Sequence, residues 1–291
     1  MKARFLPVVP RLFSRGQLLL EARRQVDGLY AGGHRTRSHG SSLEFAEHRL
    51  YVPGDDPRSI DWRAYARSDR LVVRRYHEER RLPVRILIDA SISMTYGSKL
   101  DAAVLVAAML GLLALDAGDD LEVLMHGLTE RRSPPLQGTT GAERLCRFLE
   151  EDEGGRRADA TTLLTRLRDQ SPRRSLVILI SDFVGEIAPL AELARVLTGM
   201  GHDLAAIQVL DPSELALPAA WGETLLHDRE SGLQVACDAR TAKAAYDANI
   251  SAHITGLRAA LLAANVDHLL LSDPQSLTQA LSAWLVRRRT R

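Results

Sequence analysis

The chain has 291 residues, of which 45% are hydrophobic and 26% charged, and its net charge is +1. This is the ordinary balance of a soluble globular protein with one large or two modest domains. The most apolar segment, Ala102 to Leu115, is too short to span a membrane, which needs roughly 20 residues, and the N-terminus lacks the apolar core of a signal peptide. The two cysteines have no metal-type spacing and fit a reduced compartment. We therefore predict a cytoplasmic protein without a membrane span.

Charge is unevenly distributed along the chain. Residues 1–85 contain 18 Lys and Arg against 10 Asp and Glu, whereas the remainder contains 20 against 27. Such asymmetry indicates either a basic surface for an acidic partner or two segments that attract each other. Glu78 and Glu79 interrupt the arginine run between Arg74 and Arg85, and no stacking pattern of aromatic residues accompanies it. The favoured interpretation is a solvated or partner-facing strand, without a nucleic-acid partner.

Residues 1–83 are predicted to be an N-terminal helix followed by an irregular basic segment. Apolar spacing predicts the helix over residues 12–30, and residues 31–42 are typical of a loop. Residues 43–67 have no clear periodicity, whereas Leu71 to Glu78 has the composition of a strand.

Three aspartates of this segment, Asp55, Asp56 and Asp61, allow two interpretations. They are a second acidic site, or they stabilise a turn at Pro53-Gly54 by pairing with nearby arginines. We favour the structural interpretation.

From Val84 onward, strands alternate with helices. This pattern predicts an α/β fold for residues 84–291, with a doubly wound, mostly parallel sheet and a C-terminal helical extension. The run within Ser175 to Asp182 is apolar on both faces, as a central parallel strand requires. The predicted strands are Val84–Asp89, Leu121–Met125, Ser175–Asp182, Leu204–Leu210 and His268–Leu271, with a hairpin over Leu225–Cys237. The predicted helices are Lys99–Ala117, Gly141–Glu151, a short helix after Thr161, Pro189–Met200, Ala239–Ala264 and Ser276–Arg288.

Polar side chains follow two of these strands. Asp89, Ser91 and Ser93 follow the first, and because alternate side chains of an extended chain share one side, we expect the three to converge. Asp182 ends another strand and reaches the same edge of the sheet. A hard cation such as Mg²⁺ needs more oxygen ligands than one carboxylate and two hydroxyls, and Thr161 and Asp182 are the candidates to add them. The alternative is that these residues only cap loops and helices.

The order Asp-x-Ser-x-Ser, then Thr, then Asp resembles the metal-ion-dependent adhesion site of von Willebrand factor A domains. The resemblance implies that Mg²⁺ or Mn²⁺ is held by the five residues Asp89, Ser91, Ser93, Thr161 and Asp182. It also implies that the hydroxyls bind the metal directly and that an acidic residue of a partner takes the open position. Asp159 and Ala160 stand where that family usually has Gly-Gly, which makes Thr162 an alternative to Thr161.

A long upstream motif narrows the resemblance. It consists of Glu44-Phe45, Arg49, Tyr51, Pro53-Gly54-Asp55-Asp56, Arg58, Ile60-Asp61-Trp62, Ala66-Arg67, Tyr76 and Glu78-Glu79-Arg80. This motif resembles the bacterial family called domain of unknown function 58, in which it precedes a von Willebrand factor A-like domain, and the likeness covers roughly residues 28–215. Membership would imply an adaptor or assembly factor that works with a MoxR-type AAA+ ATPase and an acidic client protein to mature or remodel a protein complex.

The favoured function is therefore a non-enzymatic, metal-dependent protein-binding module. One alternative is a metal-dependent hydrolase or phosphatase with Asp89 as nucleophile, but Ser91 stands where such a phosphatase needs a second aspartate. The chain also has neither a phosphate-binding loop nor a Gly-x-Ser-x-Gly motif. The other alternative is a nucleic-acid binder that uses the basic N-terminal third.

Overall fold

The computed structural model describes residues 17–31, 45–53, 55, 60–76, 83–127, 129–151, 160–170, 174–228, 232–273 and 276–289. The chain forms two compact units, residues 37–81 on the one hand and residues 1–36 with 82–291 on the other. This division differs from the predicted boundary at residue 83, because helix α1 (Leu18–Ala31) belongs to the larger unit. Its buried face, with Leu18, Ala22 and Val26, packs in the main core beside α3 (Lys99–Asp116).

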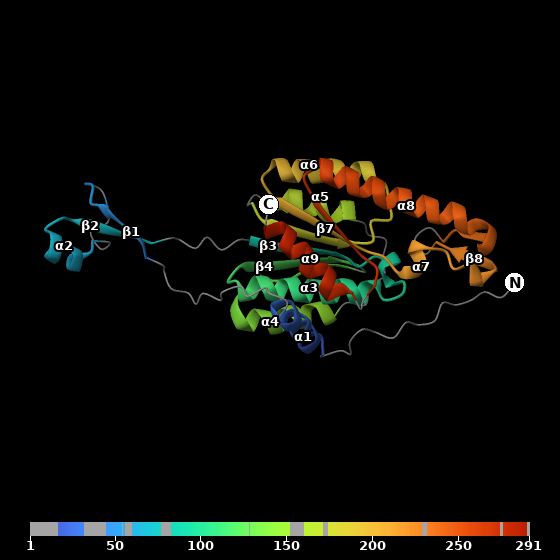
Figure 1. Ribbon diagram of the computed structural model, residues 1–291, viewed down its shortest axis with the longest axis horizontal. Helices are drawn as coiled ribbons and strands as arrows, with labels where there is room; N and C mark the ends of the chain where they lie inside the picture. Colours follow the sequence, from blue (N-terminus) through green and yellow to red (C-terminus); the bar gives the residue numbers. More distant parts are fainter. Residues whose placement is uncertain are drawn as a thin grey trace. The chain divides into compact units, whose positions relative to one another are not determined.

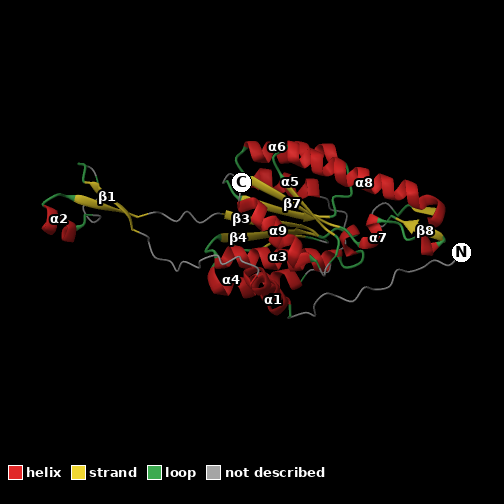
Figure 2. Ribbon diagram, viewed as in Figure 1, coloured by secondary structure: helices red, strands yellow, loops and turns green. Residues whose placement is uncertain are grey.

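A six-stranded sheet forms the centre of the larger unit (Figures 1 and 2). Its strand order is β10-β7-β6-β3-β4-β5, and every pair is parallel except β4 with β5. The predicted doubly wound, mostly parallel α/β fold is thus confirmed. The strands are β3 (Pro83–Asp89), β4 (Asp120–His126), β5 (Glu130–Arg132), β6 (Leu176–Ser181), β7 (Asp203–Val209) and β10 (Asp267–Leu271). The short edge strand β5 was absent from the sequence prediction, since Glu-Arg-Arg has none of the composition of a strand.

Helices cover both faces of the sheet (Figure 1). One face carries α1, α3, α4 (Gly138–Glu150) and α9 (Leu277–Arg289), and the other carries α5 (Ala160–Gln170), α6 (Ile187–Gly199) and α8 (Ala239–Ala263). Successive side chains of β3 supply the two layers in turn: Ile86 and Ile88 join the first core and Leu87 joins the second. This double burial explains why the central strands are apolar throughout. Helix α3 is buried on nearly all sides, as its sequence predicted, because α1 and α4 cover it opposite the sheet.

A short excursion joins β7 to α8. It contains α7 (Pro212–Leu215), the 3₁₀ turn η3 (Ala219–Trp221) and the hairpin β8 (Glu223–His227) with β9 (Gln234–Asp238). The hairpin lies where the sequence predicted one. Among the described residues, no helix combines the length and the apolar composition needed to cross a membrane.

The smaller unit contains an antiparallel pair, β1 (Phe45–Leu50) with β2 (Val72–Tyr76), and the helix α2 (Trp62–Ser68). The prediction that residues 43–67 are irregular is therefore wrong, although β2 confirms the predicted strand. The Asp61 carboxylate caps α2 by accepting hydrogen bonds from the backbone amides of Arg63 and Ala64 at 3.0 and 3.1 Å. Asp55 accepts a hydrogen bond from the Val52 amide in a turn, so the described contacts of both carboxylates are structural and are made to backbone amides, whereas we expected arginine side chains, while Asp56 lies outside the described residues.

Candidate functional site

The candidate site lies at the switch point of the doubly wound sheet. Strands β3 and β6 are neighbours, but the helices that follow them, α3 and α6, lie on opposite faces of the sheet. The carboxyl ends of two such strands leave a crevice between their loops, which is where ligands bind in open α/β sheets. Asp89 is the last residue of β3, and Asp182 directly follows β6. The two carboxylates predicted from the strand ends therefore reach the same crevice.

The Asp89 carboxylate is almost completely buried, with 2% of the residue exposed. Its Oδ1 accepts a hydrogen bond from the backbone amide of Ser91 at 2.9 Å, and its Oδ2 accepts one from the Ser181 hydroxyl at 2.7 Å. Burial, and then the negative charge of Asp182, raises the pKa of Asp89 to about 6, against the opposing effect of the hydrogen bonds. When such a buried carboxylate is ionised, a nearby cation stabilises it strongly, because little water is present to screen the charges.

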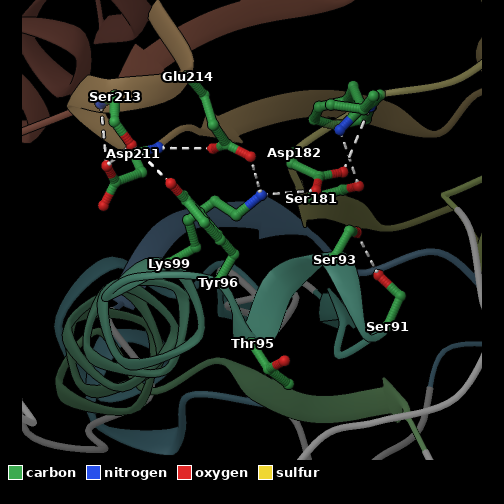
Figure 3. A network of polar contacts seen from close by, with 12 residues as sticks. Ser91, Ser93, Thr95, Tyr96, Lys99, Ser181, Asp182, Asp211, Ser213 and Glu214 are labelled. Carbon is green, nitrogen blue, oxygen red and sulfur yellow. Dashed lines mark hydrogen bonds and ion pairs between the residues drawn. The ribbon is translucent and has the colours of Figure 1, made fainter. Parts of the chain in front are cut away.

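The hydroxyls of Ser91 and Ser93 lie 3.0 Å apart, as Figure 3 shows. Asp89, Ser91 and Ser93 thus converge as expected, but not because the chain stays extended. The segment turns into the 3₁₀ helix η2 (Ser93–Thr95), and the Asp89 carboxylate fixes the start of that turn through the Ser91 amide. A tight turn, rather than strand periodicity, brings the second hydroxyl beside the first.

Thr161 lies in the first turn of α5 and lines the same cavity as Asp89 and Asp182. The cavity has a volume of about 240 Å³ and continues from these polar groups toward apolar side chains at the start of α6. Thr162 is not among the described residues that line it, and neither are Ser91 and Ser93, which reach the site through the turn that binds Asp89. Asp159, which replaces a glycine of the adhesion-site pattern, lies outside the described residues.

Asp182 is held by several contacts. Its Oδ1 accepts a hydrogen bond from the Val184 amide at 3.3 Å, and its backbone carbonyl accepts one from the buried Gln208 amide group at 2.9 Å. The next residue, Phe183, has a left-handed backbone with φ of 52°, and its carbonyl lies 2.9 Å from Nε2 of His253 on α8. These contacts fix the loop after β6, so the Asp182 carboxylate is preorganised at the mouth of the crevice.

Sequence reasoning missed Lys99, the first residue of α3. Its ammonium group is buried and lies 2.9 Å from Oδ2 of Asp182 and 2.7 Å from Oε1 of Glu214 (Figure 3). Burial disfavours the charged amine, but the negative charges of Asp182 and Glu214 outweigh it and raise the pKa of Lys99 above its usual value. A lysine at a helix N-terminus is unfavourable unless carboxylates compensate its charge. The place of Lys99 at the start of the predicted helix could therefore have indicated carboxylate partners.

The donor set fits a hard divalent cation. The five predicted ligands offer carboxylate and hydroxyl oxygens, which Mg²⁺ and Mn²⁺ prefer. Among the described residues, no group of three His, Cys, Asp or Glu side chains could hold a metal by itself, so a cation here depends on the hydroxyls. Asp182 and Glu214 share the ammonium group of Lys99, whereas the described partners of the Asp89 carboxylate are the Ser91 amide and the Ser181 hydroxyl, so negative charge is in excess when these carboxylates are ionised. A divalent cation balances that excess.

Comparison with known proteins places the chain in a family. The family described as "Protein of unknown function DUF58" matches residues 47–255. The chain belongs to the DUF58 family. This confirms the resemblance of the upstream motif, although the match begins and ends later than the predicted span of residues 28–215. A relative from Mycobacterium tuberculosis, "Uncharacterized protein Rv1480", is 32% identical over an alignment of 272 residues, which covers 88% of this chain and 85% of the relative. The Mycobacterium bovis protein Mb1516 has the same identity and coverage.

Several solved structures resemble this DUF58 protein in fold. BatB from Bacteroides thetaiotaomicron aligns with a TM-score of 0.47 and 16% identity over 72% of this chain and 100% of BatB. The SpRpn10 VWA domain aligns with a TM-score of 0.43 and 11% identity over 69% of this chain and 93% of that domain. The mussel byssus protein PTMP1 with a zinc-occupied MIDAS motif has a TM-score of 0.41 and 15% identity, over 70% of this chain and 46% of PTMP1.

Proposed function

We propose that this DUF58 protein is a non-enzymatic protein-binding module that docks its partner through a divalent cation. Mg²⁺ or Mn²⁺ would be held by the five predicted ligands Asp89, Ser91, Ser93, Thr161 and Asp182. The observation that carries the proposal is that Asp89, Thr161 and Asp182 line one cavity at the switch point, while the Ser91 and Ser93 hydroxyls lie together in the turn that the Asp89 carboxylate holds. When bound, the cation would supply an open coordination position for a carboxylate of the partner.

The residues of the chain prepare the site for that role. The hydrogen bonds from Ser91 and Ser181 orient the Asp89 carboxylate, and the Val184 amide orients Asp182. The cavity next to the carboxylates is large enough for a side chain of a partner. The resemblance in sequence supports a MoxR-type AAA+ ATPase and an acidic client protein as partners, with this chain as the adaptor between them.

The hydrolase alternative is less compatible with the geometry. A phosphatase of that kind needs a second carboxylate as acid/base beside its nucleophile, whereas both described hydrogen-bond partners of the Asp89 carboxylate are serines. Ser91 stands where such a phosphatase carries its acid/base aspartate, and its backbone amide binds Asp89. No described contact favours a nucleic-acid partner over a protein.

The proposal is tested first with the metal alone and then with the ATPase. Calorimetric titration with Mn²⁺ should show binding to the wild type and at least tenfold weaker binding to Asp89→Ala. The MoxR-type ATPase of the same organism should be retained by the immobilised protein in Mg²⁺ and lost in EDTA or with Asp89→Ala. Asp116→Ala, which removes a carboxylate paired with Arg23 at the C-terminal end of α3, is the matched control. Equal retention by all three proteins, with and without metal, would refute the proposal.

A further inference from the structure

Lys99 joins two loops that are distant in sequence. Its ammonium group contacts Asp182, which follows β6, and Glu214, which lies in α7. The side chain of Lys99 is 1% exposed and that of Asp182 is 4% exposed, while that of Glu214 is 23% exposed. A buried ammonium group that two carboxylates share is sensitive to any further charge placed beside either of them, because screening by water is weak there.

Glu214 connects this pair to a second set of contacts. Its Oε2 accepts a hydrogen bond from the Asp211 amide at 2.8 Å, which completes a capping box at α7. Its backbone carbonyl accepts a hydrogen bond from the Tyr246 hydroxyl of α8 at 3.0 Å. Tyr96 lies in the loop after β3, and its hydroxyl is 2.8 Å from the Ser213 hydroxyl of α7 (Figure 3). The loop after β3, the loop after β6 and α7 therefore form one continuous polar network.

We propose that Lys99 is a positioning residue that couples occupancy of the metal site to α7. The inference rests on the proposed function, because it takes the five-residue cluster as a cation site. Without the metal, Lys99 neutralises Asp182 and is shared with Glu214. A divalent cation held by Asp89 and Asp182 would place two further positive charges near the Lys99 ammonium group. Repulsion then weakens the Lys99–Asp182 contact and leaves Lys99 paired with Glu214 alone, which holds α7 more firmly.

This role predicts the sign of two measurements. In Lys99→Met the positive charge that opposes the metal is gone, so Mn²⁺ should bind at least fivefold more tightly than to the wild type. A lysine that only supports the fold would instead give weaker or unchanged binding. In the wild type, Mg²⁺ should slow amide hydrogen exchange in a peptide covering residues 211–217, whose Ser213 and Leu217 amides bond to the Asp211 and Asp247 carboxylates. In Lys99→Met that slowing should be absent.

A matched charge control and a milder variant complete the test. Arg23→Met removes one positive charge from the partly exposed pair with Asp116 and should leave Mn²⁺ affinity within twofold of the wild type. Should Lys99→Met fail to fold, Glu214→Gln serves instead: Lys99 then pairs with Asp182 alone, so Mn²⁺ should bind at least threefold more weakly and exchange at 211–217 should no longer respond to Mg²⁺.

The outcomes separate this inference from the proposed function. If Mn²⁺ binds the wild type but its affinity for Lys99→Met does not rise, or exchange at residues 211–217 does not change with metal, the role of Lys99 is refuted and the metal site stands. Unchanged Mn²⁺ affinity in Glu214→Gln would refute it equally. If Mn²⁺ does not bind the wild type, the proposed metal site itself is refuted.

Discussion

Replacing Asp89 by asparagine is expected to stabilise the metal-free protein while it abolishes metal binding. Burial and the charge of Asp182 raise the pKa of Asp89 from 3.8 to about 6, so the ionised carboxylate is less favourable in the folded protein than in the unfolded chain. At neutral pH that difference corresponds to about 3 kcal/mol. Asparagine has nearly the same shape: its oxygen can accept from the Ser91 amide and its NH₂ group can donate to the Ser181 hydroxyl. We therefore expect a gain of about 1–3 kcal/mol in the free energy of unfolding.

The pH dependence of this gain follows from the direction of the shift. Because the folded pKa of Asp89 lies above the unfolded value, the folded protein holds the proton more tightly, and stability falls as the pH rises from 3.8 through about 6. Asparagine does not titrate, so its advantage over the wild type should be near zero at about pH 4, grow with pH, and level off above about pH 7.

Urea unfolding in EDTA, at several pH values between about 4 and 8, measures this difference. Asp116→Asn is the control, because its carboxylate pairs with Arg23 at the surface and its loss should change stability by less than about 1 kcal/mol. Added Mn²⁺ should raise the unfolding midpoint of the wild type but not that of Asp89→Asn. If Asp89→Asn were less stable than the wild type at every pH, the carboxylate would not be desolvated as its contacts indicate, and the reasoning would fail.

Two further predictions concern the core and the sheet. Gly111→Ala places a Cβ atom 2.5 Å from Leu145 Cδ2, and the overpacking, about 1–3 kcal/mol, should exceed the gain in helix propensity of about 1 kcal/mol and lower the thermal midpoint. In Gly199→Ala the added Cβ atom has no other atom within 4 Å, so this variant should raise the thermal midpoint. If the midpoints of both variants shifted in the same direction, the packing argument would be contradicted. Burial, followed by the charge of Arg258, lowers the pKa of His268 to about 4, so stability should be lost as the pH falls from about 6.5 through 4. His268→Gln should unfold with a weaker acid dependence over that interval, and an unchanged dependence would show that His268 is not the group responsible.

Much of the larger unit was predictable because its central strands are short apolar runs that alternate with helical patterns. The runs before Asp89 and Asp182 place those carboxylates at strand ends, and parallel strands must end at the same edge of a sheet. The spacing of Ser91 and Ser93 led us to expect that their hydroxyls lie close together, and they do. The reason we assumed, an extended chain, is not the cause, because the segment turns into η2. The site could thus be located from local sequence even though its local geometry could not.

The contacts that sequence reasoning missed join distant parts of the chain. Lys99 is separated by 83 residues from Asp182 and by 115 from Glu214, and no local pattern marks such a pair. The strand β1 was missed for a related reason, since it depends on hydrogen bonds to β2 rather than on its own composition. The amphipathic pattern of α1 predicted a helix, whereas its packing against α3 depends on a surface formed by residues far along the chain.

The position of α1 changes how this protein can be dissected. Since residues 1–36 belong with 82–291, the unit of residues 37–81 is an insertion within a discontinuous domain rather than an appendage before it. A fragment that begins at residue 84 would leave the α3 surface facing Leu18, Ala22 and Val26 uncovered, and apolar area of that kind promotes aggregation. Excising residues 37–81 and reconnecting residue 36 to residue 82 through a flexible linker would keep α1 in place, and would separate what the insertion contributes from what the metal site contributes.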